Sequence, residues 1–194
     1  MPPADPEALD PPRRPSRGEL LAAYGQTIPD LVAPGLRVLL CGINPSLWSG
    51  WAGQHFARPA NRLWTTLHLA GFTSRRLHPS ETGELLAAGL GVTNLVDRAT
   101  ARADELTTEE LGNGVGPLTA LVERWEPGYV AFLGLSAYRI AFGRPRAGVG
   151  PQLEQLAGTP VWVLPNPSGL NAHYQQPKLT AAYTELRRAA YADS

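Results

Sequence analysis

The sequence predicts an α/β domain in which a mostly parallel sheet is covered by helices on both faces. Short apolar runs typical of buried strands alternate with segments of helical period, an order that favours parallel strands joined by helices. The 194 residues suit one domain with its own core, which we expect to span residues 18–194. Residues 1–17 combine proline and charge with few apolar side chains, so we expect a disordered tail there.

The first half of the chain predicts two strands. Residues 37–41 contain an apolar run and predict the first strand. Residues 44–53 are rich in Asn, Pro, Ser and Gly, so they predict a long loop, which carries Trp48 and Trp51. The other elements expected here are helices at residues 18–24, 60–70 and 79–88, the last capped by Ser80, and a second strand at residues 91–96.

The second half predicts two more strands. Residues 117–125 place apolar side chains at the i, i+3, i+4 and i+7 spacing of an amphipathic helix, and residues 129–133 form a buried strand. Glycine and proline make residues 143–158 a surface excursion. The remaining expected elements are helices starting at residue 107 and at Ser136, a strand at residues 161–164, a loop at residues 165–174 and a closing helix at residues 175–191.

Composition excludes several classes of function. Lys plus Arg and Asp plus Glu both total 17, so no net positive charge indicates nucleic acid. The one cysteine, Cys41, lies within an expected strand and suits a small buried side chain better than a nucleophile. The four histidines lack ligand spacing, so we expect no metal, and no apolar run approaches a membrane span. We expect a cytoplasmic protein.

No motif indicates a bound nucleotide cofactor or a serine nucleophile. The glycines after the first strand are too spread out for GxGxxG, and neither GK[ST] nor GxSxG occurs. In a parallel sheet the carboxyl ends of the strands share one edge, where open α/β sheets bind ligands. The polar and aromatic residues expected there are Asn44, Phe56, Asn61, Asp97, Asn166 and Ser168.

An amide side chain is a poor general base, but it can hold a water molecule by accepting and donating hydrogen bonds. Such a site suits a bond that breaks mainly by departure of its leaving group, as in hydrolysis of an N-glycosidic bond. Backbone donors could stabilise the leaving base, and Asp97 could stabilise the cationic sugar. Asp97 has a simpler alternative, an ion pair or a loop cap.

Four motifs in order, GINPS, FARPANRLW, GVTNLVDRAT and VWVLPNPSGL, resemble the mismatch-specific uracil-DNA glycosylase and thymine-DNA glycosylase branch of the uracil-DNA glycosylase superfamily. The resemblance covers residues 33–191. It implies a three-layer α/β/α sandwich around a four-stranded parallel sheet, order 2-1-3-4, with no cofactor. It also implies a monofunctional enzyme of base-excision repair that flips uracil, or a related damaged pyrimidine, out of a G·U mismatch in double-stranded DNA and leaves an abasic site. We expect a monomer, associated with the nucleoid in a bacterium.

The resemblance assigns roles to individual residues. Asn44 positions the attacking water and Phe56 stacks on the flipped base, whose edge meets the backbone amides of Ile43 and Phe56. Asn166 stands where other branches have histidine. The other implied contacts are Ser168 to the substrate and, to DNA, Ser46, Ser49 and the wedge residues Gly169, Leu170 and Asn171, with carbonyl groups near Gly169 and Asn171 facing the widowed guanine.

The sequence departs from the family pattern and leaves alternatives open. Ser46, Asn94 and Ala172 stand where bacterial members tend to have glycine, lysine and arginine. Trp48 and Trp51 either pack the first loop against the domain or stack on DNA. The alternative function is a mismatch-binding or lesion-binding protein of the same fold with little turnover. An enzyme of free nucleosides is less consistent with the Leu170 wedge.

Overall fold

The protein is described from a computed structural model that covers residues 13–192 and contains a central five-stranded sheet. The order of the strands is β2-β1-β3-β5-β4. Their bounds are Val38–Gly42 for β1, Leu90–Asn94 for β2, Tyr129–Leu133 for β3, Gly150–Leu156 for β4 and Thr159–Leu164 for β5.

The four-stranded, all-parallel sheet implied by the sequence is therefore only partly right. Strands β2, β1, β3 and β5 pair in parallel, and their order is the one expected for the four strands. However, β4 adds an antiparallel strand at the edge, within residues 143–158, where we expected a surface excursion. The middle residues of β4 alternate between exposed and half-buried. Because this edge strand is not buried, its sequence lacks the apolar run that marks a buried strand.

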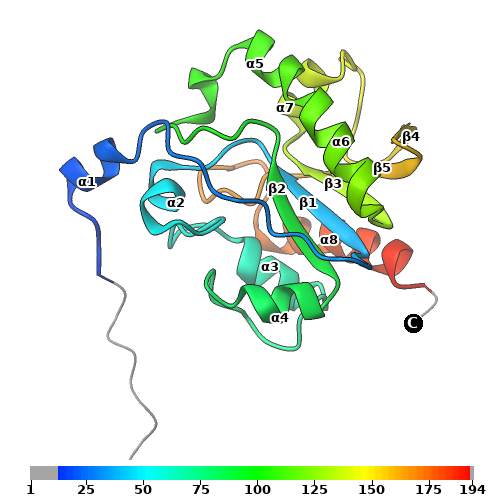
Figure 1. Cartoon of the computed structure of the whole chain (residues 1–194). Helices are drawn as coiled ribbons and strands as arrows, with labels where there is room; N and C mark the ends of the chain where they lie inside the picture. Colours follow the sequence, from blue (N-terminus) through cyan, green and yellow to red (C-terminus); the bar gives the residue numbers. More distant parts are fainter. Residues whose placement is uncertain (1–12, 193–194) are drawn as a thin grey trace, which may run out of the picture.

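Helices cover both faces of the sheet, which makes three layers (Figure 1). One face carries α3 (Leu63–Leu69), α4 (Thr82–Ala87) and α8 (Gln176–Ala190), and the other carries α5 (Thr108–Asn113), α6 (Val115–Trp125) and α7 (Leu135–Ala141). Side chains of β1 alternate between the two cores: Val38 and Leu40 pack toward α3, and Leu39 and Cys41 pack toward α6. Cys41 is buried, as expected.

The loop expected at residues 44–53 contains a helix instead, α2 (Leu47–Ala52). The Ser46 hydroxyl accepts a hydrogen bond from the Ser49 amide at 3.2 Å, and Gly53 ends the helix at φ 63°. A serine N-cap and a glycine C-cap were visible in the sequence, but six residues are too few for a clear helical period.

Three other expectations about helix starts need correction. Most of the tail expected at residues 1–17 lies outside the described residues, but Ser16 caps α1 (Arg17–Ala22). Ser80 does not cap α4, which follows Glu81, because the Ser80 hydroxyl contacts His78 Nδ1 at 2.8 Å. Ser136 lies inside α7, which begins directly after Gly134. A short 3-10 helix, η1 (Ala103–Glu105), follows β2.

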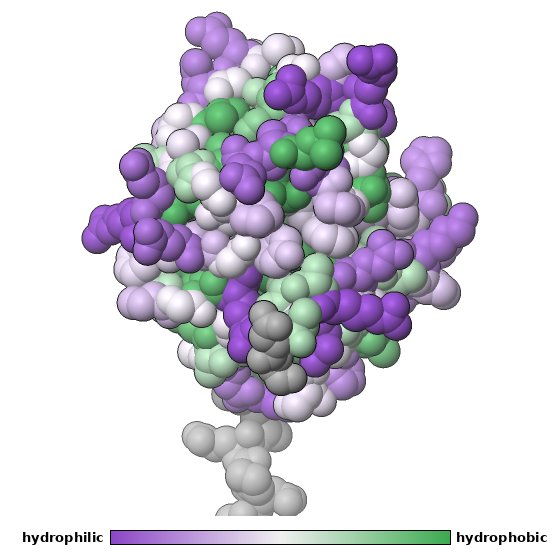
Figure 2. Space-filling model, turned by 90° about the vertical axis from the view of Figure 1, so that its right-hand side faces the viewer, coloured by the Kyte–Doolittle hydropathy of each residue, from purple (hydrophilic) through white to green (hydrophobic). Residues whose placement is uncertain are grey.

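The surface on the β4 side of the sheet is mainly hydrophilic. Figure 2 shows charged and polar side chains spread over this face, with hydrophobic side chains scattered between them. None of the helices within residues 13–192 is long and apolar enough to cross a membrane.

Candidate active site

A cavity of about 350 Å³ lies at the carboxyl ends of β1, β2 and β3. Its volume is within the ~300–1,000 Å³ range typical of small-molecule sites. Most site residues expected from the sequence line it: Ile43, Asn44, Ser46, Ser49, Phe56, Asn61, Asn166, Ser168 and Leu170. Gly169 and Asn171 lie beside these in the second loop, and Asp97 lies elsewhere.

Both amide protons of Asn44 are committed to the protein. Nδ2 of Asn44 donates to the Arg98 carbonyl oxygen at 3.0 Å and to Thr100 Oγ1 at 2.8 Å. The Thr100 hydroxyl donates its own proton to the Arg102 carbonyl oxygen at 2.7 Å, so it accepts from Asn44. Oδ1 of Asn44 therefore stays available as an acceptor for a water molecule. Thr100 was missed in the sequence, although it ends the motif GVTNLVDRAT.

Phe56 is held in an unusual backbone conformation above Gly42. Its φ of 51° lies in the left-handed region, and its carbonyl oxygen accepts a hydrogen bond from Trp64 Nε1 at 3.1 Å. A Cβ on Gly42 would lie 3.1 Å from Phe56 Cζ and 2.5 Å from Asn94 Oδ1. Glycine at the end of β1 therefore makes room for the ring at the floor of the cavity.

Ser46 and Ser49 hold the first loop in shape. Their hydroxyl groups lie 3.1 Å apart, and Ser49 Oγ also accepts a hydrogen bond from the Ala57 amide at 3.2 Å. Ser49 is buried, so its contacts connect α2 to the segment that carries Phe56. The structure gives both serines a role in the loop itself, and the contacts with DNA expected of them stay a prediction.

His55 and Asn94 form a polar pair beside the cavity that sequence reasoning did not assign to the site. His55 Nε2 donates to the Pro29 carbonyl oxygen at 2.9 Å, which leaves Nδ1 to accept from Asn94 Nδ2 at 3.4 Å. Burial lowers the pKa of His55, against smaller opposing effects of the Pro29 carbonyl and Asp30. The ring is therefore neutral and fixes the orientation of Asn94.

The second loop presents an amide and an exposed leucine at the cavity. Asn166 Oδ1 accepts a hydrogen bond from the Ser168 amide at 2.9 Å, so Nδ2 of Asn166 is left as a donor on the cavity wall. Ser168 Oγ accepts from the Leu170 amide at 3.3 Å. Leu170 is 75% exposed and lies at the lining of the cavity, so its position beside the site, rather than its exposure, distinguishes it from the other exposed apolar residues.

Arg62 holds this loop and was missed as a functional residue. Its guanidinium donates to the carbonyl oxygens of Ser168 at 2.8 Å, Asn171 at 3.1 Å and Tyr174 at 2.7 Å. The Asn171 carbonyl, expected to face a guanine, already accepts one hydrogen bond and retains a second lone pair. The only signal for Arg62 in the sequence was its place in FARPANRLW.

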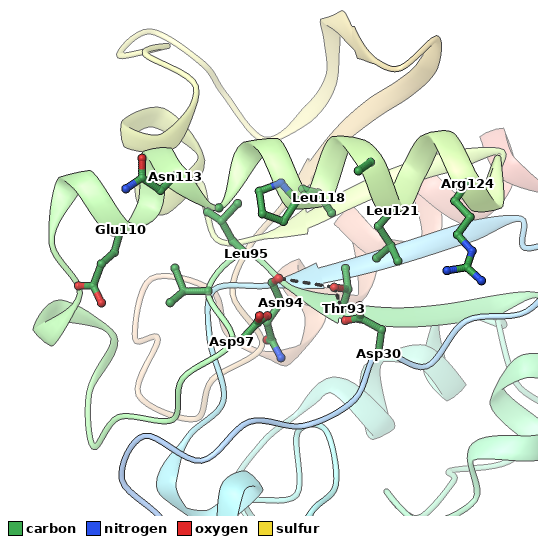
Figure 3. A pocket seen from close by; sticks show the side chains of 14 residues that line it. Asp30, Thr93, Asn94, Leu95, Asp97, Glu110, Asn113, Leu118, Leu121 and Arg124 are labelled. Carbon is green, nitrogen blue, oxygen red and sulfur yellow. Dashed lines mark hydrogen bonds between the residues drawn. The ribbon is translucent and has the colours of Figure 1, made fainter.

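Asp97 lines a second cavity, of about 470 Å³, together with Asp30. Figure 3 shows Asp30, Thr93 and Asp97 near one another below α6. Asp97 is exposed, but partial desolvation and then the negative charge of Asp30 raise its pKa. Arg98, the neighbouring arginine, does not form the ion pair expected as the simpler role of Asp97. It pairs with Glu110 instead, with Arg98 Nε 2.6 Å from Glu110 Oε1. The structure does not bring Asp97 to the cavity that Asn44 lines.

The fold and the first cavity define an α/β/α protein with an amide-and-aromatic site at the carboxyl ends of parallel strands. The family model "Uracil DNA glycosylase superfamily" matches residues 29–189, and the chain belongs to that superfamily. The superfamily expected from the motifs is thereby confirmed, and its mismatch-specific branch stays a prediction. Membership supports a DNA glycosylase, a hydrolase that acts on DNA.

The fold also resembles a solved structure of low sequence identity. This is the solution NMR structure of a protein from Methanosarcina acetivorans described as a putative uracil DNA glycosylase. The two chains share 17% identity at a TM-score of 0.58, and the match covers 84% of this chain and 99% of the other. At this identity the similarity concerns the fold alone.

Proposed function

We propose that this protein is a monofunctional uracil-DNA glycosylase that removes uracil from G·U mismatches in duplex DNA and leaves an abasic site. The observation that carries the proposal is the Asn44 amide. Because Arg98 and Thr100 take both of its protons, its oxygen is the atom left to accept a hydrogen bond from a water in the cavity that Asn44 lines. Phe56, across the same cavity, supplies an aromatic face for a flipped base.

Stacking on Phe56 would hold the base. Each base–aromatic stack contributes roughly 1–3 kcal/mol in single-strand binding proteins. The absence of a Cβ at Gly42 leaves the Phe56 ring close to the floor of the cavity. Ile43 and Phe56 both line this cavity, and we expect their main-chain amides to meet the edge of the pyrimidine. The loop contacts of Ser49 keep this arrangement in place before the base arrives.

Cleavage would begin with departure of the base. The bonding pair of the C1′–N1 bond moves to the base, whose carbonyl oxygen gains negative charge. Nδ2 of Asn166 is a fixed donor for that oxygen, since Oδ1 already accepts from Ser168. The water held by Asn44 then bonds to the cationic C1′ and loses a proton to solvent. An amide donor carries no net charge, so its stabilisation is weaker than that of an imidazolium.

Leu170 supports DNA rather than a free nucleoside as the substrate. An exposed apolar wedge at the cavity mouth can fill the stack vacated by a flipped base and offset an unstacking cost of a few kcal/mol. The proposed mismatch preference rests on the second lone pair of the Asn171 carbonyl, which could accept from a guanine. Asp97 as a second catalytic group remains a hypothesis, and its position in the other cavity argues against it.

The test is strand cleavage by alkali after incubation of a duplex that contains one uracil opposite guanine. We expect cleavage by the native protein and a loss of at least 100-fold with Asn44→Ala. The panel includes uracil opposite adenine, uracil in a single strand, thymine opposite guanine and ethenocytosine. Binding without cleavage of any lesion would instead favour a mismatch-binding protein. If the protein cleaves none of the substrates in the panel, the glycosylase function is rejected.

A further inference from the structure

A larger hollow of about 830 Å³ adjoins the base cavity. The two share Phe56, Arg58 and Asn61 in their linings, so they lie next to each other. The outer hollow extends from there across α2 to residues 76–79, which precede α4. We call it the tryptophan groove and define it by Trp48, Trp51, Arg58 and Arg76.

Two aromatic rings form one wall of the tryptophan groove. Trp48 and Trp51 lie three residues apart on α2, so they share a face of that helix. Their ring centroids are 6.1 Å apart at an interplanar angle of 77°, and both side chains are only half-buried. Packing against the domain therefore does not account for all of their surface, and both residues line the groove. The Arg13 guanidinium lies 5.5 Å from the Trp51 ring centroid, so a base that stacks on that face of Trp51 displaces Arg13.

The charge around these rings is strongly positive. Four arginines line the groove, Arg13, Arg14, Arg58 and Arg76, and Arg13 is ion-paired with Glu19. Among residues 13–192, the one carboxylate in its lining is that of Glu81, which pairs with Arg75 at 2.7 Å. Within residues 13–192, Arg14, Arg58 and Arg76 take part in none of the ion pairs. The groove therefore concentrates positive charge on a protein whose formal net charge is zero.

We propose that the tryptophan groove binds unpaired nucleotides of single-stranded DNA that flank the flipped nucleotide. Aromatic rings beside arginines are the combination that single-strand binding sites use, because bases stack on the rings and phosphates contact the cations. A paired base in a duplex is covered on both faces by its neighbours, so only an unpaired base offers a face to Trp48 or Trp51. The placement of these nucleotides beside a flipped one rests on the proposed function, because it assumes a flipped base against Phe56.

The test measures binding of a fluorescein-labelled, uracil-free dT12 strand and of a duplex of equal length, at one fixed salt concentration. We expect Trp48→Leu and Trp51→Leu to weaken single-strand binding about 5- to 150-fold, the range that loss of one stack implies. Trp51→Phe keeps an aromatic face and should lose much less. Duplex binding should change little in any of these variants.

Trp125→Leu is the matched control. Trp125 is also half-buried and lies beside an arginine, with Arg124 Cζ 5.4 Å from its ring centroid, but it belongs to α6. Its substitution should leave single-strand binding unchanged. Equal losses in the Trp125 and Trp51 variants would overturn the proposal, as would equal losses for strand and duplex.

Arg58→Gln gives an independent readout if a leucine variant fails to fold. We expect the slope of log Kd against log salt to fall by about 0.7 for the single strand, as for loss of one phosphate contact. An unchanged slope would overturn the proposal. Because dT12 contains no uracil, its binding is measured independently of the G·U cleavage assay. Binding of dT12 that depends on Trp51, with no cleavage of the G·U duplex, would support the groove and reject the glycosylase. Cleavage of the duplex without Trp51-dependent binding of dT12 would do the opposite.

Discussion

Arg62 donates a hydrogen bond to the main-chain carbonyl oxygen of Tyr174 at 2.7 Å, which joins the start of α3 to the far end of the loop that carries Leu170. The same guanidinium also contacts the Ser168 and Asn171 carbonyls, so one side chain holds the loop at three points. The Leu170 side chain can enter a duplex only if the loop that carries it keeps one conformation. Arg62 therefore positions the wedge without contacting the base cavity itself.

Replacing Arg62 with methionine should loosen this loop. Each hydrogen bond to a charged group contributes about 1.5–3 kcal/mol, and water can replace Arg62 at part of the three carbonyl groups, so we expect a loss of stability of at least one such bond, about 1.5–3 kcal/mol. Urea unfolding measures it, with Arg76→Gln as an exposed control. The ratio kcat/KM on a G·U duplex should also fall, and more steeply than on uracil in a single strand, where no stack needs filling. Equal falls on both substrates would contradict a positioning role for Arg62.

Thr100→Val should release the Asn44 amide. Valine has the shape of threonine but neither accepts from Nδ2 nor donates to the Arg102 carbonyl. A misplaced water costs on the order of 100-fold in rate, so we expect kcat to fall about that much while KM changes little. Single-turnover assays separate the two constants. Thr100→Ser should restore most of the rate, and a serine variant as slow as the valine variant would count against this account.

Asp97→Asn tests the second cavity. The pKa of Asp97 is raised by partial desolvation and by Asp30, so the folded state holds this proton more tightly than the unfolded chain does. The free energy of unfolding therefore falls as the pH rises above the usual pKa of a carboxyl group, because the ionised form is less favourable in the folded state. Asparagine does not ionise, so the variant does not lose this stability. We expect the variant to be more stable at pH 7 and to cleave a G·U duplex at the native rate. A large fall in kcat would restore the catalytic hypothesis for Asp97.

His55 should make stability depend on pH. Its pKa lies below the usual value of about 6.5, so the unfolded chain binds a proton more readily than the folded one. The stability that the neutral ring contributes is present above about pH 6.5 and is lost as the pH falls below that value. Urea unfolding at pH 5, 6, 7 and 8 measures this slope. His55→Gln should flatten it, whereas substitution of the exposed His78 should not.

The parallel part of the fold could be predicted because each buried strand carries its own apolar run. Strand β4 could not be predicted, because an edge strand with exposed residues has no apolar run. Helix α2 could not be predicted either, because six residues are too few to show a helical period. Asn44, Phe56 and Leu170 were found through motifs. Thr100 and Arg62 were not, because their contacts span 56 residues to Asn44 and more than 100 to the second loop, distances that local patterns do not encode.

Cys41 gives the protein a built-in reporter of its own unfolding. It is the single thiol, and it lies on β1, an interior strand of the sheet, buried against the α6 core. Burial raises its pKa, so almost no thiolate exists in the folded protein, and reagents that modify thiols cannot reach it. Labelling requires β1 to separate from its neighbours, which is among the most costly openings of the domain. The labelling rate of the native chain therefore tracks global opening rather than fraying at its loops or ends.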